Sequence, residues 1–422
     1  MSDRNPFRRA SFRQWYAATT LLAIGTSTTL AVTLLLVDLT KNVALAGVIS
    51  SLILAVELIA GPIGGGLADI VSRKKILLRA LTLALFANAA IVATLFLLPT
   101  IQNGGQKWMV WLVIGALVLS AAATGVADPA LDASARSLIS PGEFPRAMSA
   151  EHARSSTLQI VGNPLSGGLY AIAIQIPFVL RLICDMGFVL TLKNIKRSLG
   201  PSLNSTGGPP ATAPGLRNTR NLFEGYHEAF KFLRGHRVLR RILIAAPLVN
   251  LLVFSGTSWT VLHLAAIRMD PFLTGIAAAG FAIGGLLGSS VAPRLTDSIP
   301  PGILAIGGLS WMAIAFLLIF MTGDNVVLIF VIAIIAMLPS PSLNGGLFGH
   351  VFSETSDDMQ GRVMATFSLM GGLSSVIAPA LAGLAVKYGL DLSLAIASFS
   401  VGVIGVLVLA TSEDVRRMPL LS

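Results

Sequence analysis

The chain has 422 residues, of which 54% are hydrophobic and only 12% are charged, and its mean hydropathy is +0.79. Soluble domains carry about 25% charged residues, so this composition excludes an ordinary soluble protein and indicates a membrane-embedded one. The single cysteine, Cys184, excludes an internal disulfide framework, and basic loops beside a membrane explain the net charge of +10 without nucleic-acid binding.

The first apolar segment, residues 14–37, follows a cluster of arginines that resembles the start of a signal peptide. A signal-peptide core has only about 7 to 15 apolar residues, whereas this segment is long enough to cross a bilayer. We therefore expect a retained membrane helix.

Further apolar stretches near the length of about 17 residues needed to span a bilayer recur along the whole chain. All should be helices, because a segment in lipid must satisfy its own backbone hydrogen bonds. The predicted spans are residues 14–37, 43–66, 76–99, 108–126, 149–172, 176–192, 242–267, 272–292, 303–321, 326–343, 362–386 and 392–411. The expected fold is an all-α membrane protein with twelve transmembrane helices in two pseudo-symmetric six-helix bundles.

Alternating these spans places 25 of the 30 Lys and Arg residues on one side, 4 on the other and Arg181 within a span. The positive side is the cytoplasm, so both termini are predicted to be cytoplasmic, with the chain in a bacterial inner membrane. Residues 198–215 are rich in Gly, Pro and Ser and should form a flexible linker, followed by an amphipathic helix on the membrane surface.

An internal repeat supports this division. Three short motifs recur at offsets of 212, 216 and 215 residues, among them residues 163–168 (NPLSGG) against 378–383 (APALAG). The predicted domains are an N-terminal bundle at residues 1–192, a linker region with its helix at 193–241, and a C-terminal bundle at 242–422. A binding site is expected between related halves, near the bilayer midplane.

The break after the second span reads GGLADIVSRKK, at residues 65–75. It resembles the G-x-L-A-D-R-x-G-R-K loop of the major facilitator superfamily, although Ile70 and Ser72 depart from that pattern. Four further stretches resemble the macrolide-efflux and enterobactin-exporter branch, whose members export drugs and siderophores, usually against protons. They are residues 136–139 (RSLI), 163–168 (NPLSGG), 223–226 (FEGY) and 360–363 (QGRV).

This resemblance implies a gating loop formed by Gly65, Asp69 and Arg73 with Arg362 at the start of the eleventh span. Asp69 also has a physical rationale, because a carboxylate is stabilised by the positive N-terminal end of a helix. Such a contact would hold the cytoplasmic side closed. The alternative is that the basic residues of this loop are only topology signals.

The NPLSGG element in the fifth span is similar to the G-P-x-x-G-G motif of antiporters, with Asn163 in place of the first glycine. Pro164 removes a backbone donor, while Gly167 and Gly168 permit close helix contact. Pro379 is the counterpart in the eleventh span. Kinking and packing alone would account for these residues, so they leave antiport open.

Charged residues within spans are functional candidates because their transfer into lipid is costly. Glu57 in the second span has no basic residue within a helical turn and is predicted to carry the coupled proton. Arg181 and Asp185 in the sixth span are spaced to pair with each other. The predicted proton-coupling set is therefore Glu57, Asp185 and Arg181, and purely structural roles remain the alternative.

Polar residues on two other spans suit a substrate cavity. Gln159 and Asn163 lie on the fifth span, and Asn250 and Trp259 on the seventh. Trp259 could stack on a flat or cationic ligand, or could equally be a packed core aromatic.

The expected function is secondary export of small amphipathic molecules by alternating access in exchange for protons, by a monomer with no cofactor and no metal. A major facilitator importer and an uncoupled facilitator are the alternatives within transport. A membrane-embedded enzyme would need clustered His, Asp or Glu side chains, whereas the five histidines are scattered.

Overall fold

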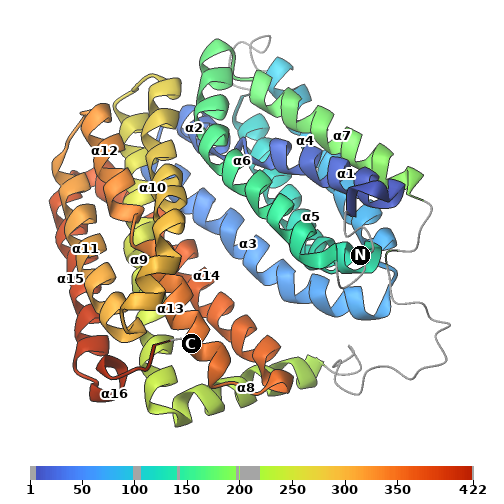
Figure 1. The fold of residues 1–422 in the computed structure, drawn as a ribbon. Helices are drawn as coiled ribbons and strands as arrows, with labels where there is room; N and C mark the ends of the chain where they lie inside the picture. Colours follow the sequence, from blue (N-terminus) through green and yellow to red (C-terminus); the bar gives the residue numbers. More distant parts are fainter. Residues whose placement is uncertain (1–5, 98–105, 140–142, 196–198, 200–218, 421–422) are drawn as a thin grey trace, which may run out of the picture. The chain divides into compact units, whose positions relative to one another are not determined.

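The computed structural model describes residues 6–97, 106–139, 143–195, 199 and 219–420. Within that part of the chain all regular structure is helical (Figure 1). The side chains of residues 69, 70, 106, 107, 136, 145, 219–226, 357 and 358 are not described.

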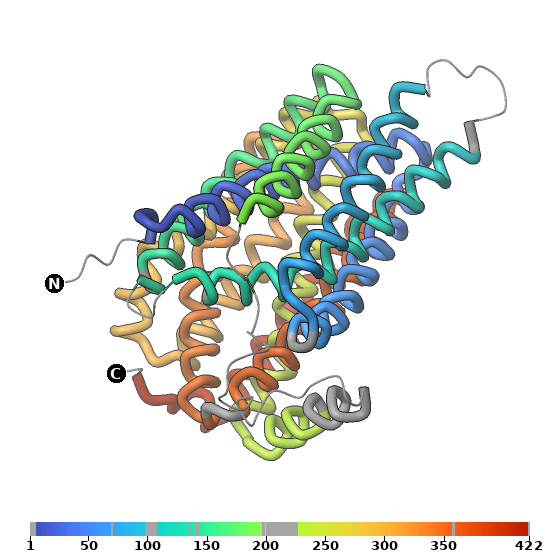
Figure 2. The backbone as a smooth tube through the Cα atoms, turned by 90° about the vertical axis from the view of Figure 1, so that its right-hand side faces the viewer, coloured from blue at the N-terminus to red at the C-terminus, as the bar shows by residue number. Residues whose placement is uncertain are grey.

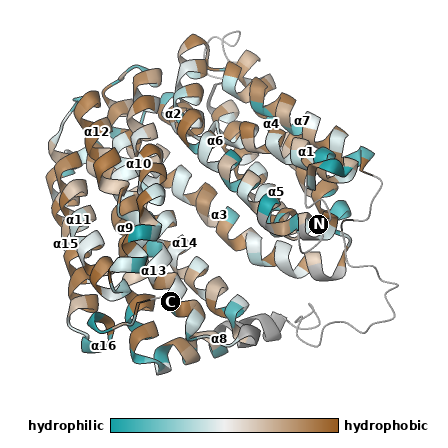
Figure 3. Cartoon of the chain, in the orientation of Figure 1, coloured by the Kyte–Doolittle hydropathy of each residue, from teal (hydrophilic) through white to brown (hydrophobic). Residues whose placement is uncertain are grey.

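The helices follow the predicted spans closely, and most of their length is apolar (Figure 3). After the short helix η1 (Pro6–Arg8), the first half contains α1 (Ala10–Thr26), α2 (Thr29–Thr40), α3 (Val43–Ile70), α4 (Arg73–Leu97), α5 (Gln106–Leu138), α6 (Phe144–Ile172) and α7 (Ile176–Asn194). The second half contains α8 (Thr219–Gly235), α9 (Arg237–Ala266), α10 (Pro271–Ser298), α11 (Pro301–Met321), α12 (Val326–Met337), α13 (Ser340–Ser353), α14 (Asp357–Tyr388), α15 (Asp391–Ala410) and α16 (Glu413–Arg416).

Among the described residues, ten helices are long and apolar enough to cross a membrane. Two of these are split, since α1 with α2 and α12 with α13 each form one span. The remaining two predicted spans correspond to α6 and α7. The fold class predicted from the sequence, an all-helical membrane protein, is confirmed.

The chain divides into two compact units. The first contains residues 1–35 and 52–219, and the second contains residues 36–51 and 220–422. The boundary therefore runs through α3, whose first turns pack with the second unit. There the backbone N–H of Ala380, which follows Pro379 in α14, donates to Oγ of Ser51 at 3.0 Å.

The break in the first span is an unpredicted feature with a local cause. Oγ of Ser27 and Oγ1 of Thr28 bond back to carbonyls one turn earlier, at 2.7 Å each, in competition with the helical ladder. The N–H of Ala31, in the first turn of α2, donates to Oγ of Ser166 in α6 at 2.9 Å. Ser166 is fully buried and shares this donor with the backbone oxygen of Thr28, which is 3.0 Å from the same nitrogen.

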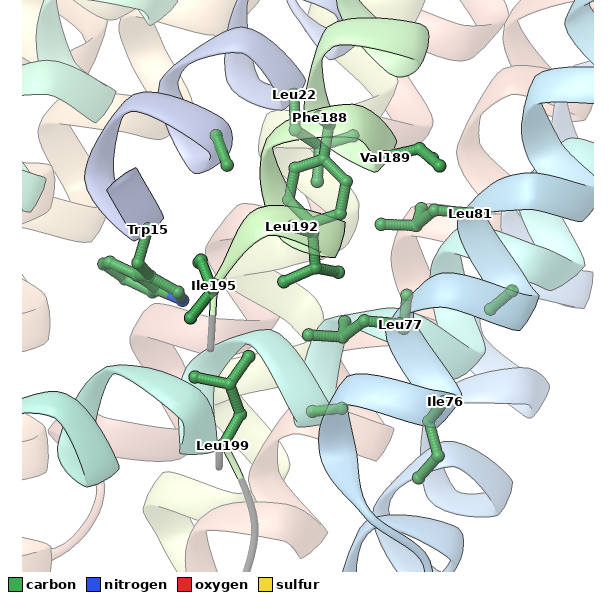
Figure 4. Packing of buried hydrophobic residues seen from close by; sticks show 14 of the residues in the cluster. Trp15, Leu22, Ile76, Leu77, Leu81, Phe188, Val189, Leu192, Ile195 and Leu199 are labelled. Carbon is green, nitrogen blue, oxygen red and sulfur yellow. The ribbon is translucent and has the colours of Figure 1, made fainter. Parts of the chain in front are cut away.

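The core of the first unit lies where α1, α4, α5 and α7 meet (Figure 4). Trp15, Leu77, Phe188 and Leu192 are each at most 3% exposed and come from three of these helices. α4 and α5 run side by side over much of their length (Figure 2). This packing fixes the helices that carry the membrane-embedded charges.

Candidate functional site

The acidic part of the candidate site lies where α3 crosses α5. A Cβ on Gly125 of α5 would lie 2.6 Å from the backbone oxygen of Glu57, so the two helices approach closely at this point. Asp128 follows one turn later on α5 and is exposed, while Glu57 is half-buried. The carboxylates of Glu57 and Asp128 interact electrostatically, and Asp132 adds a third nearby negative charge.

The basic part of the site is on α7. Nη2 of Arg181 donates to Oγ of Ser120 in α5 at 3.4 Å, and its charge acts on both Glu57 and Asp185. Asp185 is 4% exposed and accepts a 2.6 Å hydrogen bond from Nδ2 of Asn88 in α4. α3, α4, α5 and α7 therefore contribute to one polar network within the first unit (Figure 1).

This network corrects the predicted pairing of Arg181 with Asp185. Within the described structure Arg181 forms no ion pair shorter than 4.0 Å, and Asp185 is hydrogen-bonded to Asn88 instead. The i, i+4 spacing allowed a direct ion pair, but the hydrogen bond that Asp185 accepts comes from Asn88 on a neighbouring helix, while Arg181 acts on Asp185 through its charge. Glu57 also has a basic neighbour, Arg181, which comes from another helix and was not visible in a single-helix pattern.

Asp128 lies outside the predicted proton-coupling set, because it stands beyond the end of the predicted fourth span, at residue 126. In the structure α5 continues unbroken to Leu138. Asp128 therefore lies on the same helix as the crossing with α3, close enough to Glu57 for the two charges to interact. The sequence feature that indicates this position is the helical pattern that continues through residues 127–138.

The second unit lacks a comparable group. Within the described helices α9 to α15, acidic residues occur only at helix ends, as Asp297, Asp357, Asp358 and Asp391. In the described ranges no group of three or more His, Cys, Asp or Glu side chains is placed to hold a metal ion.

The predicted gating loop is resolved in part. Arg73 starts α4, and its Nη1 donates to the backbone oxygen of Ala133 in α5 at 3.0 Å. Nζ of the neighbouring Lys74 donates to the backbone oxygens of Lys193 and Ile195 at 3.1 and 2.6 Å, which satisfies the C-terminal end of α7. Arg73 and Lys74 thus join α4 to α5 and to the end of α7. They have a structural role in the first unit in addition to any effect on membrane orientation.

The other gate residues are placed separately. Gly65 lies in α3 with only the Pro129 side chain near its Cβ position. Arg362, near the start of α14, forms a 2.5 Å ion pair with Glu228 of α8. The side chain of Asp69 lies outside the described residues.

The predicted cavity residues differ in accessibility. On α6, Gln159 is exposed, Asn163, Pro164 and Gly168 are half-buried, and Gly167 is buried. On α9, Asn250 is half-buried, and its Nδ2 would lie 2.7 Å from a Cβ on Gly371 of α14. Asn250 therefore packs against α14 at Gly371, where the missing side chain leaves room for the amide.

Trp259 is not a cavity residue in this structure. It is 1% exposed, its Nε1 donates to Oδ1 of Asp391 at 2.5 Å, and its ring stacks on His263 with centroids 4.5 Å apart. His263 in turn bonds to Asp324 at 3.0 Å. The ring of Trp259 packs on His263 and its N–H donates to Asp391, both within the second unit. Of the two roles considered for Trp259, the structure favours the packed aromatic over the ligand contact.

Residues 16–379 match the family model of the Major Facilitator Superfamily. The chain belongs to this superfamily. Its members are transporters and not enzymes, so this chain is a multi-pass membrane transporter of the major facilitator type. No curated relative matches the sequence.

Solved structures share the fold. A bacterial homologue of the iron transporter ferroportin in an inward-facing state is 13% identical, with a TM-score of 0.73 over 95% of this chain and 98% of that one. A D-xylose–proton symporter is 15% identical, with a TM-score of 0.70 over 97% and 98%. A bacterial metal transporter is 14% identical, with a TM-score of 0.68 over 96% and 98%. At this identity the likeness concerns the major facilitator fold alone.

Proposed function

We propose that this major facilitator transporter exports small amphipathic molecules in exchange for protons, with Glu57 as the proton carrier and Asp128 as its partner. The observation that supports this most directly is the pairing of these carboxylates where α3 crosses α5, beside Arg181. Carboxylates within membrane spans are costly and are used for proton relays. Helices α9 to α15 carry their described acids only at helix ends, which favours coupling in the first unit.

Arg181 gives the site a way to respond to a proton. Its guanidinium acts on Glu57 and on Asp185, which belong to different helices. When Glu57 is ionised, the positive charge is shared between the two carboxylates. When Glu57 takes up a proton, that share is lost and Arg181 interacts with Asp185 alone, which changes the balance of forces between α3 and α7.

The proposed direction of transport and the substrate class rest on the sequence resemblance and on polar side chains of α6. The stretches that resemble the macrolide-efflux and enterobactin-exporter branch favour export of a drug-like or siderophore-like molecule. Exposed Gln159 and half-buried Asn163 on α6 would offer amide groups to such a substrate in an otherwise apolar surrounding.

The proposed gate and membrane orientation complete this scheme. Asp69 at the end of α3 would close the cytoplasmic side against the N-terminal end of α14 when the transporter faces outward. Both termini would be cytoplasmic, in a bacterial inner membrane, as the charge distribution of the loops favours.

Inverted membrane vesicles that contain the overexpressed chain test this function. We expect a panel of fluorescent amphipathic dyes to include at least one that accumulates in energised vesicles and is released when a protonophore collapses the pH gradient. Vesicles with the chain carrying Asp297→Asn, an exposed acid at a helix end, should behave identically. Equal dye accumulation with and without the chain, across drug-like and siderophore-like compounds, would contradict proton-driven export.

A further inference from the structure

A row of exposed cations runs along α8 and the start of α9. Lys231, Arg234, Arg237 and Arg240 follow one another at intervals of three residues, and all four side chains are exposed. Lys231 and Arg234 lie one turn apart on α8, and Arg237 and Arg240 lie one turn apart on α9, on either side of the break at His236 between the two helices. Figure 3 shows hydrophilic colour on both helices near this junction. We call these four residues the basic row.

The orientation of the basic row is fixed by contacts within the second unit. Ala229 and Leu233 of α8 are fully buried, so this face of the helix is covered by protein. Arg362 of α14 holds α8 through its ion pair with Glu228. Phe230, which is 40% exposed, presents an apolar ring beside the basic row.

The basic row lies at a membrane boundary. α9 begins at Arg237 and is a candidate span, and Leu239, Ile242 and Leu243 follow immediately as buried apolar residues. At 1.5 Å per residue, the distance along the helix from Arg237 to Leu243 is only about 9 Å. Headgroups of the adjoining leaflet are therefore within reach of long basic side chains, which extend to the interface.

Few acidic residues lie near the basic row in the sequence. Glu228 is the sole acidic residue between 227 and 241, and it is already paired with Arg362. Exposed apolar Phe230 beside unneutralised cations is the pattern of a helix that lies in the interface of an anionic bilayer.

We infer that the basic row is a binding surface for the anionic phosphate headgroups of membrane phospholipids. Because Arg362 joins α8 to the first turns of α14, bound headgroups would also hold the start of α14 in place. This inference concerns a surface outside the proton site and does not depend on the proposed direction or substrate of transport.

A local reporter on α8 tests the inference with the full-length chain in detergent. His227, which is exposed, is changed to Cys and labelled with an environment-sensitive fluorophore, since the native Cys184 is buried. Phosphatidylglycerol and phosphatidylcholine are then titrated separately. We expect preferential binding of phosphatidylglycerol, weakened at least about tenfold by the triple variant Arg234→Gln, Arg237→Gln, Arg240→Gln.

Two matched variants separate local charge from other effects. Replacing the same three arginines by Lys should keep the affinity within about threefold, because Lys and Arg contribute similarly to attraction toward an anionic lipid surface. Replacing three exposed cations elsewhere in the second unit, Arg268→Gln, Arg294→Gln and Lys387→Gln, should leave the titration unchanged. An equal loss of affinity in the Lys variant or in this control would overturn the inference.

Inorganic phosphate distinguishes a lipid surface from a site for a free anion. About 10 mM phosphate should change neither the reporter signal nor the phosphatidylglycerol titration beyond the screening expected at equal ionic strength. Saturable displacement of the lipid by phosphate would overturn the lipid assignment. An unchanged phosphatidylglycerol affinity in the triple Gln variant would overturn the whole inference.

Discussion

At the residue scale, Arg181 and Asp185 find their hydrogen-bond partners on other helices and not along their own. Asp185 on α7 is paired with Asn88 on α4, and Arg181 with Ser120 on α5. A buried carboxylate that loses a partner keeps its cost of burial without the compensating bond. The polar network therefore contributes to folding as well as to the proposed coupling.

Asn88→Ala tests the structural part of this network. It removes the donor to Asp185 and should lower the stability of the detergent-solubilised protein by about 1 to 3 kcal/mol. Thr94→Val is the control on the same helix, because Thr94 is equally buried but bonds only to its own helix, at Ala90. Thermal unfolding measures both, and equal midpoints for the two variants would show that the Asn88 bond contributes little.

Trp259→Phe tests the correction made at the seventh span. Phe keeps the stacking on His263 but loses the hydrogen bond to Asp391, so we expect a loss of about 1.5 to 3 kcal/mol in stability and unchanged substrate affinity. Dye binding is measured beside thermal unfolding. A large fall in dye affinity with unchanged stability would restore Trp259 to the substrate cavity.

At the element scale, close helix crossings decide which residues meet. A Cβ on Gly64 of α3 would clash with the backbone of Val126, whereas a Cβ on Gly61, one turn earlier on the same helix, meets nothing within 4 Å. Glycine at residue 64 therefore sets the spacing of α3 and α5, and with it the separation of Glu57 and Asp128. This spacing follows from backbone contact and not from any polar bond.

Gly64→Ala should consequently lower stability by about 1 to 3 kcal/mol and impair gradient-driven dye accumulation. Gly61→Ala should be neutral or slightly stabilising, because alanine favours a helix and has room at this position. Both variants are compared by thermal unfolding and by transport in vesicles. Destabilisation of the same size in both would indicate that helix propensity, and not the crossing, matters here.

Hydrophobic runs predicted the helices well, because each span must be apolar over a fixed length. They could not predict the break at Ser27 and Thr28, since apolar residues continue on both sides and the compensating Ser166 is distant in sequence. They also could not predict the partners of Arg181, which depend on how helices pack. Asp128 was left outside the predicted proton-coupling set because the span was ended where apolar residues thin out, although the helix continues.

At the scale of the whole molecule, the distribution of basic residues makes a claim about orientation. Arg234 on α8 should face the cytoplasm, and Asp324, between α11 and α12, should face outward. The native Cys184 is buried and gives little background in labelling experiments.

Single cysteines at these exposed positions test the orientation in intact cells. A membrane-impermeant maleimide should label Asp324→Cys directly but Arg234→Cys only after permeabilisation. Labelling of Arg234→Cys in sealed cells would reverse the orientation and, with it, the side on which the gate and the basic row are proposed to lie.

Proton coupling through Glu57 is the central claim, and transport by Glu57→Gln in inverted vesicles tests it most directly. Gln imitates the protonated carboxyl group, so the variant should bind dye and exchange it downhill but should not accumulate it under an imposed pH gradient. Asp297→Asn, measured in parallel, should accumulate dye like the unmodified chain. Full gradient-driven accumulation by Glu57→Gln would contradict the account and shift the proton site to Asp128.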